Sequence, residues 1–363
     1  MSRQGAAGPD GHTADSDTSI MVSICCITYN HIAYLGQALD SFLAQRVEFP
    51  IEIVVHDDAS TDGTQSVILE YQRRHPGRIR SILQTTNQYS RGKKPFLDFV
   101  LPSARGKYIA VCEGDDYWTD PQKLALQVAF LEAHPSFSMS FHNVQRAYEG
   151  PVLDVPTLFA PRDQRAEVTI DDLVVSCPIP TLSVVMRREL LHNLPSWLHT
   201  MKATDWPLFA VVAENGPAGF IDRVMGVHRS HPGGVWAYKA AIHHLTTKLA
   251  TLAALEAHFG ELHKTRIRLR ASLLWLELAN AYAGEARYSE ARRAFARSTR
   301  MRPLRNYVLR EKQEYPYDRF ERVGLSHVAN SFVASYLPAF HRTLSRAFAA
   351  VRRPASAGSR EPS

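Results

Sequence analysis

The chain has 363 residues, of which 45% are hydrophobic and 21% are charged. Such a composition is typical of globular proteins that bury a core, and it excludes a largely disordered chain. The formal net charge is +6, and the positive excess lies mostly in the C-terminal third. No RNA- or DNA-binding motif with interleaved aromatic residues accompanies these charges, so we expect no nucleic-acid partner.

The ends of the chain and its cysteines bear on where the protein works. Residues 1–20 and 351–363 are polar and are predicted to be disordered tails, and the first of them lacks the apolar segment of a signal peptide. The four cysteines show neither metal-type nor disulfide-type spacing, which predicts reduced core residues. No uncharged apolar run is long enough to cross a bilayer. We therefore expect a cytoplasmic protein.

The first predicted elements alternate between strand and helix. Strands are predicted over residues 22–28, 51–56, 79–83 and 108–112. A helix is predicted over residues 33–45, and a second helix is expected to be capped by Ser60 or Thr61. Strands that alternate with helices imply parallel strands joined by right-handed crossovers, in a sheet covered on both faces. Ligands bind at the carboxyl ends of the strands in such sheets.

The second group of elements is more varied. We expect a helix after Pro121 that runs through His134, a strand over 137–148, a proline-rich loop over 151–161, a strand over 182–186, a helix over 205–215 and a strand over 220–227. From about Trp236 the pattern is helical throughout, with many Ala, Leu and Arg residues. This change in composition predicts a domain boundary near residue 240, between an N-terminal domain over 21–240 and a helical domain over 241–350.

Two clusters of carboxylates follow predicted strands. The first contains Asp57 and Asp58, and the second contains Glu113, Asp115 and Asp116. Acidic side chains this close together repel one another unless a cation lies between them, a basic ligand group binds them, or their pKa values are raised. Because both clusters fall at the carboxyl ends of strands, we expect them to bind an anionic ligand through a bridging metal ion.

Four segments of the N-terminal domain resemble the family-2 inverting glycosyltransferases. They are Val22-Ser23-Ile24-Cys25-Cys26-Ile27-Thr28-Tyr29-Asn30, Val54-Val55-His56-Asp57-Asp58-Ala59-Ser60-Thr61-Asp62-Gly63-Thr64, Gly106-Lys107-Tyr108-Ile109 with Glu113-Gly114-Asp115-Asp116-Tyr117-Trp118, and Ala203-Thr204-Asp205-Trp206. The order and spacing of the four segments make the resemblance specific. It implies the GT-A fold, an α/β architecture in which helices flank a mixed sheet that binds a nucleoside diphosphate sugar.

The resemblance also implies which residues contact the donor. The donor-binding set is Thr28, Tyr29, Asn30, Asp57, Asp58, Glu113, Gly114, Arg229 and His231. A carboxylate that accepts a hydrogen bond from a pyrimidine N3–H would give a preference for uracil. For Ser60 and Asp62, turn and helix-cap chemistry is an equally good interpretation. Arg229 or His231 is expected to bind the diphosphate, and His231 is also a candidate metal ligand.

The metal and catalytic residues follow from the same resemblance. The family's Asp-x-Asp motif is Glu113-Gly114-Asp115 here, which makes Asp115 a direct ligand of Mn²⁺ or Mg²⁺ and Asp116 a second ligand or a turn cap. Asp205 stands where the family's catalytic base falls, although it is also placed to cap a helix. Acceptor contacts are expected from Thr181, Ser183 and Trp118.

The helical domain contains one segment, residues 272–305, that resembles a tetratricopeptide repeat. An ordinary helical hairpin explains the same pattern. Residues 328–351 combine aromatic and basic side chains, which predicts either an interfacial amphipathic helix or packing against the repeat. The first alternative would place the protein at the inner face of the plasma membrane or on a protein partner.

The sequence thus predicts an inverting, metal-dependent glycosyltransferase that moves a sugar from a UDP-sugar to a hydroxyl of a glycan or lipid-linked acceptor in polysaccharide or surface-glycan synthesis. Two other functions stay open. A nucleotidyltransferase shares the α/β sheet and acidic metal site but needs no base at Asp205. A helical-repeat binding protein with a degenerate catalytic half would bind neither UDP nor Mn²⁺.

Overall fold

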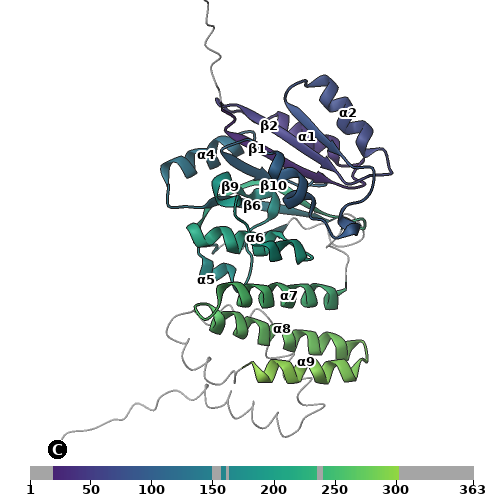
Figure 1. The fold of residues 1–363 in the computed structure, drawn as a ribbon, viewed down its shortest axis with the longest axis vertical. Coiled ribbons are helices and arrows are strands. Elements are labelled where there is room, and N and C mark those ends of the chain that lie inside the picture. Colours follow the sequence, from purple (N-terminus) through teal and green to yellow (C-terminus); the bar gives the residue numbers. More distant parts are fainter. Residues whose placement is uncertain (1–18, 149–156, 161–162, 235–239, 302–363) are drawn as a thin grey trace, which may run out of the picture. The chain divides into compact units, whose positions relative to one another are not determined.

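The structure is a computed structural model that describes residues 19–148, 157–160, 163–234 and 240–301 (Figure 1). Packing divides the chain into two units, Met1–Ala237 and Tyr238–Ser363. The first unit contains a mixed sheet with helices on both sides, and the second is helical.

One sheet of ten strands organises the described part of the first unit. Its strands are β1 (Val22–Thr28), β2 (Ile51–Asp57), β3 (Ile79–Leu83), β4 (Tyr108–Val111), β5 (Tyr117–Trp118), β6 (Met139–Tyr148), β7 (Thr157–Leu158), β8 (Glu167–Val168), β9 (Val185–Arg187) and β10 (Ala218–Ser230). The strand order is β3-β2-β1-β4-β9-β6-β10-β5, while β7 pairs with β6 and β8 with β10.

Six α-helices and one π-helix accompany this sheet among the described residues. They are α1 (Leu35–Leu43), α2 (Thr64–Arg74), the π-helix Phe96–Val100, α3 (Leu101–Ser103), α4 (Lys123–Ala133), α5 (Ile170–Leu173) and α6 (Asp205–Val212). Side chains of α1, α2 and α4 share one apolar cluster with β1, β2 and β4. Figure 1 shows α5 and α6 on the side of the sheet opposite α1 and α2.

Alternation of side chains along the strands explains how both faces of the sheet are covered. In β1, Ile24 and Cys26 belong to the cluster that packs against α1 and α2. In β2, His56 points to the other face, where its ring stacks on Phe99 of the π-helix with the ring centroids 5.2 Å apart. All four cysteines are free, and Cys25, Cys26 and Cys112 are buried, as predicted.

The sheet is mixed because β5, β7, β8 and β9 run antiparallel to their neighbours. β3, β2, β1 and β4 are parallel, whereas β9 runs antiparallel to both β4 and β6. β10 is parallel to β6, and β5 is antiparallel to β10. As a result β1, β2, β4 and β10 all end at the same edge of the sheet. This edge carries the candidate site.

Two predicted boundaries were wrong for local reasons. The second helix begins at Thr64 because Ser60 and Thr61 bond instead to Asn30 across the loop. The strand predicted over 182–186 begins only at Val185, since Thr181–Ser183 forms a 3₁₀ turn closed by the Ser183 hydroxyl on the Pro180 carbonyl. In both cases a side-chain hydrogen bond replaces regular backbone pairing.

The second unit contains α7 (Ala241–Phe259), α8 (Lys264–Gly284) and α9 (Tyr288–Arg300) in its described part. α8 and α9 form a helical hairpin in which the Ser298 hydroxyl donates to the Ser272 carbonyl at 2.8 Å. The repeat resemblance extends past the last described residue and stays a prediction, and residues 328–351 lie outside the described residues. None of the described helices is both long and apolar enough to cross a membrane.

Candidate functional site

The site lies where four strands end at one edge of the sheet. Thr28 is the last residue of β1, Asp57 of β2 and Ser230 of β10, and the acidic turn 113–116 follows β4 closely. Parallel strands bring their carboxyl ends together, so residues far apart in sequence meet here. This edge holds most of the residues predicted to contact the donor and the metal.

Hydrogen bonds hold the loop between β1 and α1 against the loop after β2. Asn30 has a φ of 55°, its N–H donates to the Ser60 hydroxyl at 2.8 Å, and its side-chain oxygen accepts from the Thr61 N–H at 2.9 Å. The N–H of His31 donates to the hydroxyl of Thr64 at 3.0 Å. Asparagine tolerates this left-handed conformation better than most residues. The backbone at His31 is therefore fixed by the fold itself.

Asp57 and Asp58 hold loops in place. The carboxylate of buried Asp57 accepts from the N–H and the hydroxyl of Ser60 and from the Gln65 amide. Asp58 accepts from the backbone N–H groups of Gln88 and Tyr89 at 2.7 and 3.0 Å. Both carboxylates thus have partners within the chain, and their predicted contact with uracil stays a prediction.

The acidic turn packs tightly against the end of β1. The N–H of Gly114 donates to the Ile27 carbonyl at 2.9 Å. A Cβ atom at Gly114 would lie 2.8 Å from both Cβ and Oγ1 of Thr28 and 3.2 Å from Nδ1 of His31. Oγ1 of Thr28 is buried and has no hydrogen-bond partner in the described chain. Glycine therefore allows the turn to approach β1, and the buried Thr28 hydroxyl keeps an unused hydrogen-bonding capacity.

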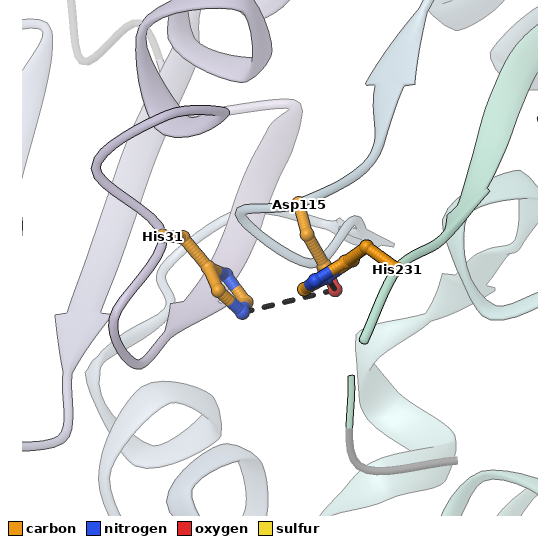
Figure 2. Close-up of side chains that lie close together, drawn as sticks. All are labelled: His31, Asp115 and His231. Atoms are coloured by element: carbon orange, nitrogen blue, oxygen red, sulfur yellow. Dashed lines mark hydrogen bonds and ion pairs between the residues drawn. The ribbon is translucent and has the colours of Figure 1, made fainter. Parts of the chain in front are cut away.

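Three side chains converge at this edge, as Figure 2 shows. Nε2 of His231 lies 3.1 Å from Oδ2 of Asp115, and Nε2 of His31 lies 3.7 Å from the same oxygen. They come from the loop after β1, the turn after β4 and the residue after β10. Each residue offers one ligand atom, and these atoms all lie within 4.8 Å of one another. Two imidazoles and a carboxylate are suitable ligands for a divalent metal ion.

Burial and hydrogen bonding shift the pKa values of the three carboxyl groups of the acidic turn in different directions. Burial, together with Asp115 and Asp205, raises the pKa of Glu113 to about 8. Burial and the neighbouring carboxylates raise the pKa of Asp116 well above its usual range. Burial also acts to raise the pKa of Asp115, but the hydrogen bond with His231 and the proximity of His31 outweigh it and lower the pKa. Asp115 is therefore the carboxylate best prepared to bind a cation.

Arg229 braces the same turn. Its Nη1 donates to the carbonyl of Asp115 at 2.7 Å, and its backbone N–H donates to Oδ1 of Asp116 at 2.8 Å. Its guanidinium carbon lies 4.4 Å from the centroid of the Tyr117 ring and 5.3 Å from that of Tyr34. Asp116 thus serves as a buried acceptor for β10 and lies outside the group of three ligands. Its role as a second metal ligand stays a prediction.

Asp205 begins α6 and lies close enough to Glu113 to raise its pKa. The hydroxyl of Thr181 lies 3.4 Å from Oδ2 of Asp205, which brings one predicted acceptor residue to the predicted base. The Asp205 side chain is not the N-cap of α6, because Thr204 occupies that position. The role of Asp205 as the general base stays a prediction.

The other two predicted acceptor residues lie in the core. Trp118 is 4% exposed, and its indole N–H donates to the Leu182 carbonyl at 2.8 Å. Ser183 is fully buried, and its hydroxyl donates to the Pro180 carbonyl. The structure therefore does not bring either side chain to the acceptor side. Tyr29, in contrast, is 44% exposed at the end of β1, as a residue in contact with a nucleotide would need to be.

From sequence, His31 was expected at the strand end with Thr28, Tyr29 and Asn30, but no role was assigned to it. The signal was present, since His31 directly follows the predicted strand end that also supplies Thr28 and Tyr29. A lone histidine has no spacing pattern that marks it as a ligand. Only the pairing of β1 with β4 brings it beside Asp115.

Comparisons with known proteins agree on the N-terminal unit. Residues 23–192 match the model of the family described as Glycosyl transferase family 2. The chain is 41% identical over 216 residues to the uncharacterized protein Rv1520 of Mycobacterium tuberculosis, an alignment that covers 59% of this chain and 60% of that protein. The chain thus spans less than two thirds of the length of this relative.

A relative of known activity is more distant. The chain is 27% identical over 221 residues to WfaP of Escherichia coli, named as a UDP-Glc:alpha-D-GlcNAc-diphosphoundecaprenol beta-1,3-glucosyltransferase, with 60% of this chain and 81% of that protein covered. Among solved structures, TarS 1-349 of S. aureus in complex with UDP-GlcNAc superposes with a TM-score of 0.54 at 19% identity, covering 78% of this chain and 83% of that one. This similarity confirms the predicted GT-A fold.

Proposed function

We propose that this protein, whose residues 23–192 match the model of the family 2 glycosyltransferases, transfers a sugar from a UDP-sugar to a hydroxyl of a glycan or lipid-linked acceptor, with inversion. The observation that carries the proposal is the meeting of Asp115 and the two histidines at the carboxyl edge of a GT-A sheet, beside Glu113, whose pKa Asp205 helps to raise. The activity of WfaP on a lipid-linked diphosphate supports the choice of acceptor class.

The donor is proposed to lie across the ends of β1 and β4. Exposed Tyr29 and the unpartnered hydroxyl of Thr28 offer a ring surface and a hydrogen bond to the nucleoside. Gly114 lets the turn lie against Thr28, which brings the backbone of the turn close to the proposed position of the sugar diphosphate. Asp57 and Asp58 hold the neighbouring loops, and in this proposal one of them also meets the base.

Asp115 and His231 are proposed to hold Mn²⁺ or Mg²⁺. Such an ion supplies positive charge that neutralises the diphosphate as the glycosidic bond breaks. Arg229 holds the Asp115 carbonyl through its guanidinium and keeps this carboxylate aimed at the edge. The positive charge of Arg229 at the same place adds to the attraction for the phosphates.

Asp205 is proposed as the general base. An inverting transfer needs one carboxylate that takes the proton from the acceptor hydroxyl as this hydroxyl attacks the anomeric carbon. Asp205, the first residue of α6, lies near Glu113. In this proposal the Thr181 hydroxyl beside Asp205 contacts the acceptor. A nucleotidyltransferase would have no use for this carboxylate, so its chemistry separates the two functions.

The helical unit is proposed to place the protein at its site of action in the cell. Its described helices carry exposed arginines on α9, including Arg292, Arg293 and Arg300. A basic surface favours an anionic membrane or a partner enzyme. We propose that the protein works at the cytoplasmic face of the plasma membrane, where a lipid-linked acceptor would be presented.

The proposal is tested by a panel of UDP-sugars and GDP-sugars with Mn²⁺ and an acceptor glycolipid. We expect Asp205→Asn to bind the donor as the native protein does, in a thermal-shift assay, and to lose turnover by about 100-fold or more because the base is absent. Asp115→Asn should lose metal-dependent donor binding in addition to turnover. Near-normal turnover of Asp205→Asn would place the base elsewhere, and reaction with NTP and sugar phosphate would favour the nucleotidyltransferase.

A further inference from the structure

We propose that His31, Asp115 and His231 form a preassembled site that binds a first-row transition-metal ion, selects it against Mg²⁺ and holds it before the nucleotide arrives. The inference deepens the proposed function, because it specifies the ion through which the donor would be bound. It adds His31 as a protein ligand and makes Mn²⁺ the expected ion of the pair Mn²⁺ and Mg²⁺.

The distances between the ligand atoms suit one ion. Two ligand atoms each about 2.1 Å from an ion lie about 3.0 Å apart when they subtend a right angle, and about 3.4 Å apart at a tetrahedral angle. The two distances to Oδ2 of Asp115 are 3.1 Å from His231 and 3.7 Å from His31. Two of the three separations are therefore close to those that one ion requires, and all three ligand atoms lie within 4.8 Å of one another.

The fold holds all three metal-binding residues in place without help from a bound molecule. His31 is anchored through its N–H on Thr64 and through the left-handed Asn30 beside it. The carbonyl of Asp115 is held by Arg229, and the His231 side chain is only 5% exposed. Little conformational entropy remains to be lost when the ion binds. Binding to the free protein is therefore expected.

The ligand types determine which ion fits. Mg²⁺ prefers oxygen ligands, keeps several waters and is usually held by one or two carboxylates plus substrate phosphates. Two imidazole nitrogens and one carboxylate instead form the arrangement that transition-metal ions occupy with open positions left for other ligands. In an octahedral ion three positions would stay open, enough for two phosphate oxygens and a water. The site thus combines metal retention with donor binding.

The test is a titration of the full chain with Mn²⁺ alone, followed by electron paramagnetic resonance. We expect one Mn²⁺ to bind in the absence of nucleotide. An excess of Mg²⁺ over Mn²⁺ of about 100-fold, which is ample to reveal a preference, should fail to displace it. Zn²⁺ should displace Mn²⁺, because affinities of nitrogen-containing sites rise from Mn²⁺ toward Zn²⁺. Binding that requires UDP, or that Mg²⁺ abolishes, would overturn the proposal.

Pulsed measurements identify the ligands directly. The spin of bound Mn²⁺ should couple to two imidazole ¹⁴N nuclei, and His31→Gln and His231→Gln should each leave one coupled nitrogen. Each variant should weaken Mn²⁺ binding by more than about 10-fold, the loss that even changes outside the ligand set can cause. The control is His199→Gln, which removes a histidine that pairs with Asp98 away from the site and should change neither quantity.

The outcomes separate this inference from the proposed function. Loss of a coupled nitrogen in His31→Gln without any sugar transfer by the native protein would support the metal site and reject the transferase. Sugar transfer with unchanged ¹⁴N coupling in His31→Gln would do the reverse. If a variant fails to fold by circular dichroism, the number of nitrogens coupled in the native protein and the Mg²⁺ competition decide the question.

Discussion

Lys123 is a buried ammonium in the core beneath the acidic turn. It has no exposed surface, its Nζ lies 4.1 Å from the centroid of the Trp118 ring, and it makes no hydrogen bond to any described residue. Burial lowers its pKa from 10.5 to about 7, and Cys112 opposes this effect only in part. The attraction to the indole ring offsets some of the cost of burying the charge.

We predict that Lys123→Met raises the free energy of unfolding at neutral pH and below. The folded state releases its proton near pH 7 and the unfolded state near 10.5, so native stability rises with pH between these values and carries the full penalty below them. The advantage of the methionine should therefore shrink as the pH rises from 7 toward 10. Urea unfolding at several pH values measures it, with Lys107→Met, an exposed lysine over Tyr108, as control. A gap between Lys123→Met and the native protein that does not vary with pH would contradict the prediction.

Gly114 shows how much the site depends on one missing side chain. We predict that Gly114→Ala weakens Mn²⁺ and donor binding, because the new Cβ would overlap Thr28 at 2.8 Å and force the turn away from β1. The Thr28 atoms it would meet belong to a buried strand that cannot easily move. Manganese titration and the thermal shift with UDP measure the loss. Gly284→Ala, whose Cβ would have no neighbour within 4 Å, should leave both unchanged.

At the scale of elements, the loop after β1 and the start of α2 form one structure. Oδ1 of Asp62 accepts from the N–H and the hydroxyl of Thr64 at 2.9 and 2.6 Å, while Oδ2 accepts from the Ile32 N–H at 3.0 Å. The Thr64 hydroxyl in turn accepts from the N–H of His31. Asp62, which precedes the N-cap residue Gly63, thus makes a cap-type contact with the first N–H of α2 and holds the loop that presents His31. Turn chemistry, one of its two interpretations from sequence, describes it well.

We predict that Asp62→Ala lowers the free energy of unfolding by about 1 kcal/mol, the usual effect of losing a helix cap, and also weakens Mn²⁺ binding through His31. Asp62→Asn keeps one acceptor oxygen and should lose less. Burial acts to raise the pKa of Asp62, but hydrogen bonds from Thr64 and Ile32 outweigh it and lower the pKa. The stabilisation is therefore present at neutral pH and should vanish as the pH falls below the ordinary range of an aspartate. A constant difference down to low pH in chemical unfolding would argue against the cap.

Periodicity found most elements but not their pairing. The buried runs that became β1 and β2, and the apolar stripe of α1, were predicted close to their observed bounds because each pattern is local. Short β5 and β8, and the reversal of β9, left no such pattern, since two or three residues have no periodicity. Their direction depends on partners far away in the chain.

At the scale of the whole molecule, the two units have separate cores. We predict that UDP with Mn²⁺ raises the melting temperature of the first unit alone, by the linkage expected when a ligand binds only the native state. Calorimetry records the transitions, and hydrogen exchange should show new protection within 19–234 and none within 240–301. Asp115→Asn supplies the control, since it should show no shift. One transition that moves as a whole would mean that the units unfold together.

The candidate site was predicted unevenly for a physical reason. Asp115 and Asp205 belong to motifs with family-specific spacing, so both were found in the sequence. The Asp58 carboxylate accepts hydrogen bonds from the backbone of Gln88 and Tyr89, and these bonds depend on how that loop folds back. Trp118 belongs to a motif as well, yet its indole is used in the core.

The sequence by itself determined the alternation of strands and helices, the family resemblance of the first unit and the acidic turn, because apolar periodicity and motif spacing are local properties of a chain. Only the tertiary structure decided that His31, Asp115 and His231 share one point. Their meeting requires β1 and β4 to pair in parallel and β10 to end at the same edge, and these long-range pairings leave no mark on the residues themselves.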